Sequence, residues 1–146
     1  MSKKILIVGR DDWGLRLEDV LKERGYTCTS VTSMVDAIQY LRDDNSGKVI
    51  LLSEDFLPIL GLIPNAPTYP QEFGSAKESQ RGIALIQYAR KEGLINSDTP
   101  AYLVSCSKEN QQIEGITSVT SPGDADIINA LNPGLHRADT RIRKKQ

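Results

Sequence analysis

The chain is poor in cysteine, histidine and tryptophan, and each shortage narrows the range of functions. Its 146 residues include two cysteines, one histidine and one tryptophan. Cys28 and Cys106 make neither a disulfide framework nor a metal-ligand spacing, and both lie in apolar or strand-like stretches, so we expect small buried side chains. The single histidine, His136, lies near the C-terminus without a companion ligand, which argues against a hydrolase triad.

Long apolar runs and a strong net charge are absent as well. Residues 5–8 form a run too short for a signal peptide, and no run reaches the roughly 18 residues of a membrane span. We therefore expect a cytoplasmic protein without a membrane span. The net charge of −1 argues against nucleic acid as a partner of the whole surface. Neither a Gly-x-Gly-x-x-Gly nor a Gly-Lys-Ser/Thr motif is present, which disfavours nucleotide binding.

The chain does contain a regular alternation of short apolar runs and amphipathic segments. Apolar or β-branched runs at 5–8, 26–31, 49–52, 101–104 and 116–119 predict strands. Helical spacing of apolar residues predicts helices at 12–24, 34–41, 82–90 and 127–131, with room for only a short one at 108–114. This order predicts one doubly wound α/β domain with a five-stranded parallel sheet and helices on both faces.

Two segments depart from the alternation. Residues 58–80 contain four prolines and are far longer than the usual connection between strand and helix. Their apolar content, Leu60 and Phe73 included, is too high for a disordered linker, so we expect a cover over the neighbouring strand ends or else a partner surface. Residues 133–146 carry five cations against Asp139 and predict a basic flexible tail, the one part suited to nucleic acid.

Binding sites in such sheets lie at the carboxyl ends of the strands. This rule directs attention to residues 9–12, 53–55, 105–107 and 120–123. Six segments around these places, in this order, resemble the receiver domain of two-component response regulators: 4–8, 21–26, 51–58, 82–86, 99–105 and the pair Ser121-Pro122. The resemblance covers residues 3–132. It implies the CheY-like, flavodoxin-like strand order 2-1-3-4-5, with 58–80 as an insertion after the third strand and a shortened fourth helix.

The resemblance also implies a site that this chain retains only in part. In the family, an aspartate after the third strand accepts a phosphoryl group from a histidine kinase. Two acids after the first strand hold Mg²⁺, and a Ser or Thr and a lysine bind the phosphoryl oxygens. Here Glu54 stands at the acceptor position, and Gly9 and Arg10 stand where the acid pair belongs. Ser121, followed by Pro122, replaces the lysine, and only Ser105 fits.

These replacements remove most of the charge that stabilises phosphoryl transfer, and one such group commonly accounts for ~10²–10³ in rate. The sequence therefore predicts a degenerate pseudo-receiver that is not an enzyme and has no metal or cofactor. Its expected work is protein–protein signalling, with a histidine kinase or a downstream signalling protein of a phosphorelay as partner.

Arg10 suggests how such a site stays ordered. An arginine in place of the metal acids can pair with Glu54 and stand in for Mg²⁺. On this hypothesis Arg10→Ala leaves a partly buried carboxylate unpaired and costs ~1–3 kcal/mol.

Two alternatives remain open. Asp11 and Asp12 lie just beyond the expected acid pair, and Asp55 adjoins Glu54, so a shifted register would give an active phosphoacceptor with Mg²⁺ between Asp12 and Asp55. The other alternative is a small-molecule or nucleotide binder that uses the strand ends.

Overall fold

A computed structural model describes residues 4–60, 69–105, 113–119 and 124–131. Its strands are β1 (Lys4–Val8), β2 (Thr27–Val31), β3 (Ile50–Glu54), β4 (Ala101–Val104) and β5 (Thr117–Val119). All pairings are parallel, and within the described residues the five strands lie in the order β2-β1-β3-β4-β5. The predicted fold class and strand order are confirmed.

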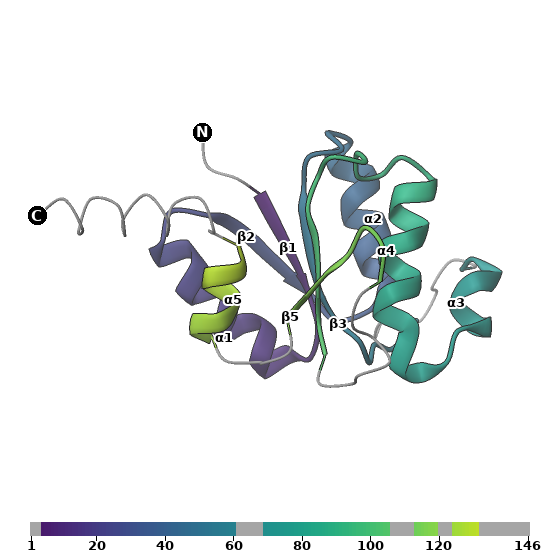
Figure 1. Cartoon of the computed structure of the whole chain (residues 1–146), viewed down its shortest axis with the longest axis horizontal. Helices are drawn as coiled ribbons and strands as arrows, with labels where there is room; N and C mark the ends of the chain where they lie inside the picture. The colour runs from purple at the N-terminus through teal and green to yellow at the C-terminus, as the bar shows by residue number, and fades with distance from the viewer. Residues whose placement is uncertain (1–3, 61–68, 106–112, 120–123, 132–146) are drawn as a thin grey trace, which may run out of the picture.

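Helices cover both faces of the sheet (Figure 1). Helices α1 (Asp11–Glu23) and α5 (Asp124–Leu131) lie on one face, and α2 (Met34–Asp44) and α4 (Arg81–Lys91) lie on the other. The side chains of β1 point alternately to the two faces of the sheet, and each face has its own hydrophobic core. Ile5 and Ile7 pack under α1 and α5, whereas Leu6 and Val8 pack under α2 and α4. No helix in the described ranges is long and apolar enough to cross a membrane.

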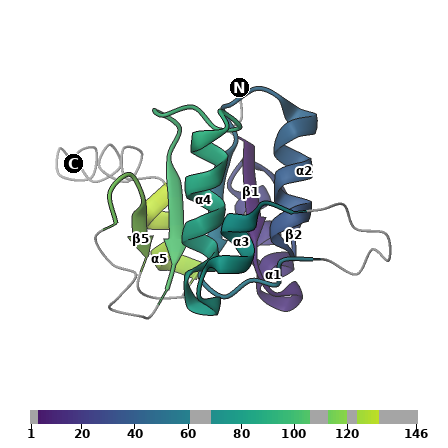
Figure 2. The same ribbon diagram turned by 90° about the vertical axis from the view of Figure 1, so that its right-hand side faces the viewer.

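Residues 69–80 of the insertion contain more secondary structure than the sequence indicated. The structure places a short helix, α3 (Gln71–Ser75), and a 3₁₀ turn, η1 (Glu78–Gln80), where we expected an irregular loop. Figure 2 shows α3 in front of the layer formed by α2 and α4. Phe73 of α3 is fully buried, and its ring meets Tyr88 of α4 edge-on with the centroids 5.2 Å apart.

Helix α3 does not form the expected cover over the strand ends. It lies on the outer side of the helical layer, because the buried Phe73 holds it against α4. Glu78 of η1, in contrast, lies beside Phe56 and Leu57, just after β3. Earlier in the insertion, the carbonyls of Pro58 and Ile59 accept hydrogen bonds from the first residues of α2. Residues 61–68 lie outside the described ranges.

The connection between β4 and β5 also bears on a prediction. The short helix expected at 108–114 falls mostly on residues 106–112, outside the described ranges, and Glu114 and Gly115 form a turn rather than a helical end. The basic tail at 133–146 and the pair Ser121-Pro122 lie outside them as well.

Cys28 packs in the core beneath α1, as the sequence predicted for a small buried residue. Loss of solvation on burial raises the pKa of its thiol to about 11. Such a thiol is largely protonated at neutral pH and suits packing rather than chemistry. Cys106 is outside the described residues.

Candidate functional site

Glu54 is the last residue of β3, and its side chain is only 12% exposed. One carboxylate oxygen, Oε1, accepts a hydrogen bond from the main-chain N–H of Arg10 at 2.8 Å. The other, Oε2, lies 3.4 Å from Nε of the same arginine. Arg10, two positions after the end of β1, therefore contacts both carboxylate oxygens of Glu54. The pairing predicted between Arg10 and Glu54 is present.

Gly9 makes room for this arrangement. A β-carbon at position 9 would lie 2.5 Å from Oε1 of Glu54 and 2.7 Å from the indole ring of Trp13, closer than real contacts allow. Trp13, on the first turn of α1, is buried against this point. Glycine lets the carboxylate and the indole both approach the main chain here, whereas any larger residue would displace one of them.

We expect the Arg10–Glu54 ion pair to contribute less than the sequence suggested. The Arg10 side chain is 83% exposed, so solvent screens the charge pair, and the main-chain N–H would remain after any non-proline substitution. We expect Arg10→Ala to lower the free energy of unfolding by less than about 1 kcal/mol rather than ~1–3 kcal/mol.

A double-mutant cycle of Arg10→Ala with Glu54→Gln, followed by urea unfolding, measures the pair directly. Glutamine keeps an oxygen for the Arg10 N–H and removes only the charge. A coupling well above 1 kcal/mol would show that the guanidinium, and not the main chain, dominates.

Asp55 has different partners from Glu54, and one of them lies at the end of β4. Its Oδ2 accepts a hydrogen bond of 2.6 Å from Oγ of Ser105, directly after β4, and its Oδ1 accepts one of 2.9 Å from the N–H of Phe56. The carbonyl of Asp55 accepts from the N–H of Gly82 at the start of α4. Two adjacent acids thus diverge: Glu54 toward β1, and half-buried Asp55 toward β4.

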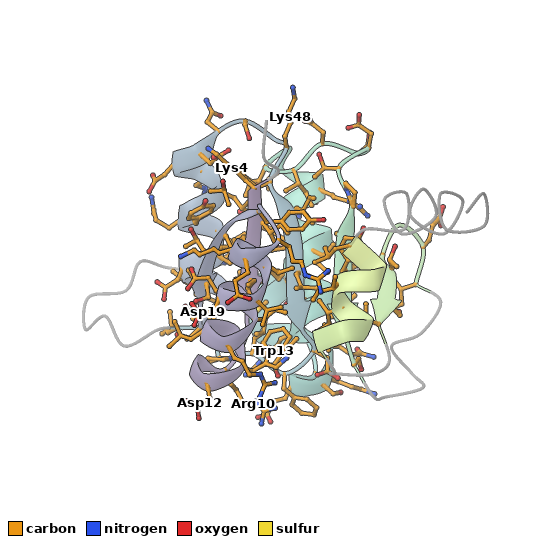
Figure 3. All side chains as sticks on the ribbon, turned by 90° about the vertical axis from the view of Figure 1, so that its left-hand side faces the viewer. Lys4, Arg10, Asp12, Trp13, Asp19 and Lys48 are labelled. Atoms are coloured by element: carbon orange, nitrogen blue, oxygen red, sulfur yellow. The ribbon has the colours of Figure 1, made fainter. Side chains whose placement is uncertain are left out.

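For the remaining predicted site residues, the structure shows no contact with Glu54 or Asp55 within the described side chains. Asp12 is exposed and points away from the body at the end of α1 (Figure 3). The Asp11 side chain, like Ser121 and Pro122, is outside what the structure describes. The metal pairing of Asp12 with Asp55 stays a prediction.

The residues present do not fit a divalent cation at Glu54. The acid pair that would bind Mg²⁺ is replaced by Gly9, which leaves no side chain, and by Arg10, which already brings a positive charge to the carboxylate. Among the side chains that the structure describes, no three or more acids, histidines or cysteines gather as a metal site.

Sequence reasoning missed three groups that surround Glu54: the Arg10 main-chain N–H, Trp13 and Gly82. A β-carbon on Gly82 would lie 2.1 Å from the carbonyl oxygen of Glu54, so this glycine lets α4 approach the end of β3. The available signal was the pair of glycines beside predicted strand ends. The main-chain donor left none, since every non-proline residue has one.

Solved structures resemble this arrangement of strands and helices. The chemotaxis response regulator CheY4 of Vibrio cholerae superposes with a TM-score of 0.64 at 13% identity, covering 91% of this chain and 98% of that one. The receiver domain of the putative LuxO repressor protein of Vibrio parahaemolyticus gives 0.60 at 12% identity, over 100% and 99%. The chain has the receiver-domain fold.

A third receiver-fold structure, from the hybrid histidine kinase CckA, gives a TM-score of 0.58 at 19% identity and covers 87% of this chain and 93% of that one. No protein-family model matches the sequence, and neither does any curated protein. Identities this low establish the fold alone, so the argument about activity depends on the site residues of this chain.

Proposed function

We propose that this chain is a receiver-fold signalling module that acts through protein contacts and independently of phosphorylation. The supporting observation is that residue Arg10 engages both carboxylate oxygens of Glu54. A carboxylate nucleophile needs an oxygen free to reach phosphorus and cations free to bind the phosphoryl oxygens. Here the oxygens already have partners, and the cation that pairs with them belongs to the protein.

The partner is proposed to be a histidine kinase or a downstream signalling protein. CckA is named a hybrid histidine kinase and CheY4 a chemotaxis response regulator, which supports this class for a chain of the same fold. Binding of a partner without phosphoryl transfer is consistent with a site in which Arg10 neutralises the charge of Glu54.

Phosphodonor labelling tests the proposal. After incubation with acetyl phosphate and Mg²⁺, we expect intact-mass spectrometry to show no gain of a phosphoryl group, because no free carboxylate–metal pair is available at Glu54. The only tryptophan, Trp13, packs at this point, so its emission should not change as Mg²⁺ is titrated. An active receiver domain labelled in parallel is the control.

Asp55 supports a second candidate, an active phosphoacceptor. Its carboxylate is half-buried and bonded to the hydroxyl of Ser105, the residue type that the resemblance places beside a phosphoryl group. On this candidate the labelled mass appears, survives in Glu54→Gln and disappears in Asp55→Asn. That pattern would contradict the phosphorylation-independent module.

A further inference from the structure

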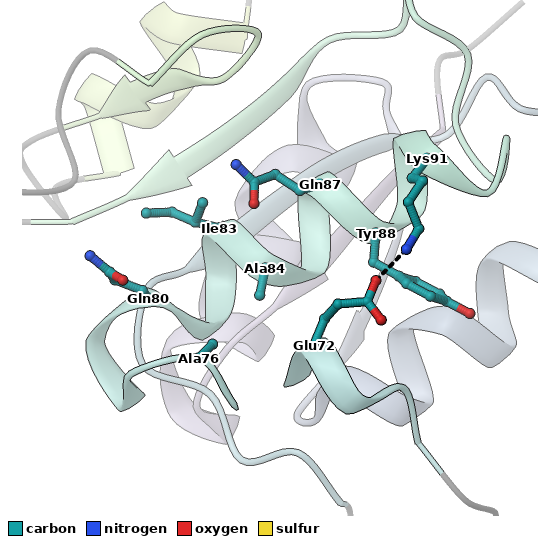
Figure 4. A pocket seen from close by; sticks show the side chains of 8 residues that line it. All are labelled: Glu72, Ala76, Gln80, Ile83, Ala84, Gln87, Tyr88 and Lys91. Atoms are coloured by element: carbon teal, nitrogen blue, oxygen red, sulfur yellow. Dashed lines mark hydrogen bonds and ion pairs between the residues drawn. The ribbon is translucent and has the colours of Figure 1, made fainter. Parts of the chain in front are cut away.

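The edge of the sheet, rather than a cavity, carries bonding groups that the chain leaves unused. In the cavity of about 330 Å³ between α3 and α4 (Figure 4), the two charged lining residues, Glu72 and Lys91, pair with each other. An edge strand, in contrast, has main-chain donors and acceptors that its own sheet cannot satisfy. The edge strands are β2 and β5, and β2 is the longer, with five residues against three.

Strand β2 keeps contact with solvent, unlike the strands beside it. Every residue of β3 and β4 is buried, and so is every residue of β1 except Lys4. In β2 only Cys28 is buried, whereas Thr27 is exposed and residues 29–31 are half-buried. Within the described ranges no strand pairs with the outer side of β2. This side of the sheet is therefore an open edge.

The register of β1 and β2 determines which main-chain groups lie at this edge. The carbonyl of Val31 accepts a hydrogen bond of 3.1 Å from the N–H of Gly9, so the main-chain groups of Val31 point toward β1. The direction of these groups alternates along a strand. Thr29 therefore also bonds toward β1, whereas Cys28 and Ser30 point their N–H and C=O groups outward. The ligand that fits such a row of donors and acceptors is another extended chain.

Residues 26–33 lack the charges, prolines and bulges by which natural edge strands avoid further pairing. The segment contains no charged residue, no proline and no glycine. Its pairing with β1 runs residue by residue, without a bulge. The threonines and the valine in it also favour strand structure. The composition is therefore that of an edge that accepts a further strand.

We propose that this edge joins two copies of the chain by antiparallel pairing of β2 with the β2 of a second copy. The outward groups are self-complementary about a two-fold axis at Thr29. Cys28 of each copy then faces Ser30 of the other, and each such pair exchanges both main-chain hydrogen bonds. A second copy is the occupant because every molecule in solution carries the same unprotected strand.

The pairing goes beyond the proposed signalling function and does not depend on it. Antiparallel strands of the two copies point in opposite directions, so the two strand-end sites at Glu54 lie at opposite ends of the joined sheet. Each site would remain available to its own partner.

Sedimentation equilibrium of the full chain, from about 1 µM to 1 mM, tests the pairing. We expect the mass to rise with concentration from that of one chain toward that of two. The dissociation constant should be micromolar or weaker, because a single strand pair buries little surface. A chain that stays monomeric over this range overturns the proposal.

Charges at position 29 test the two-fold axis. Thr29→Lys and Thr29→Glu each place like charges opposite each other and should weaken self-association about fivefold. An equimolar mixture of the two variants should associate again, because opposite charges then face each other. Thr29 is half-buried, so thermal unfolding must show that each variant is folded. The proposal fails if the folded Thr29→Lys variant associates like the parent, or if the mixture associates no better than either variant alone.

A cysteine at the same position gives a second test. Residues that face each other across this axis have α-carbons about 4.5 Å apart, a separation that suits a disulfide. Under mild oxidation, Thr29→Cys should form a covalent dimer on a non-reducing gel faster than the parent, whose Cys28 is buried. Thr117→Cys, at the exposed start of the other edge strand, is the matched control and should cross-link no faster than the parent. Equal cross-linking at positions 29 and 117 would contradict pairing through β2.

Discussion

Replacing Gly82 by alanine is expected to lower the free energy of unfolding by about 3 kcal/mol. A β-carbon there would lie 2.1 Å from the carbonyl oxygen of Glu54 and 2.8 Å from Cδ1 of Leu103. The first contact is with backbone at the end of a central strand, which cannot turn aside as a flexible side chain can. Helix α4 would have to move outward, lengthening the hydrogen bond from the Gly82 N–H to the Asp55 carbonyl. Urea unfolding monitored by circular dichroism measures the change.

Gly14→Ala is the matched control, since it makes the same change inside α1. Its β-carbon would meet nothing nearer than Ser30 at 3.4 Å, an ordinary contact. Alanine is the better helix former, so this variant should gain about 0.5–1 kcal/mol. Equal effects at the two positions would mean that α4 does not approach β3 as closely as the structure shows.

Phe73→Ala is expected to cost about 3–4 kcal/mol and to release the insertion from the helical layer. The ring is fully buried and meets Tyr88 at 5.2 Å, whereas α3 itself has only five residues. A helix this short does not persist without tertiary contacts, so the anchor, and not helix propensity, keeps α3 in place. Besides unfolding, limited proteolysis should show faster cleavage within residues 69–80.

Tyr69→Ala serves as the comparison within the same segment. This ring is 43% exposed, and its loss should cost less than about 1 kcal/mol and leave proteolysis nearly unchanged. A Phe73→Ala variant as stable as Tyr69→Ala would place Phe73 outside the core in solution. The Glu72–Lys91 pair would not rescue α3, because exposed ion pairs contribute little.

The sheet was predictable because the amino-acid composition of its strands shows which of them are buried. Residues 5–8 and 49–52 are apolar on consecutive positions, which is typical of strands covered on both faces, and the alternation with helices gave a parallel sheet. Helix α3 was not predictable in the same way. Proline precedes it, it spans barely more than one turn, and the only hint was an aromatic residue in a proline-rich loop.

The side chains that meet at Glu54 could be predicted from the sequence, but the main-chain hydrogen bond to it could not. The resemblance put Glu54 at the acceptor position and Arg10 in place of a metal acid, and the structure has that pair. The bond between Ser105 and Asp55 was missed, because adjacent acids at a strand end diverge according to backbone geometry that no spacing reveals. The exposure of the Arg10 guanidinium was not predictable for a similar reason, because it depends on the whole surface around that side chain.

The main-chain hydrogen bond to Glu54 has a consequence for how this site would drift in evolution. An amide N–H is supplied equally by every amino acid but proline, so selection on the held carboxylate would leave position 10 almost free. The restriction passes to its neighbour, Gly9, where even a methyl group collides with the carboxylate and the indole. In a set of homologous sequences we therefore expect glycine before a variable residue, a signature that a search for charged pairs would overlook.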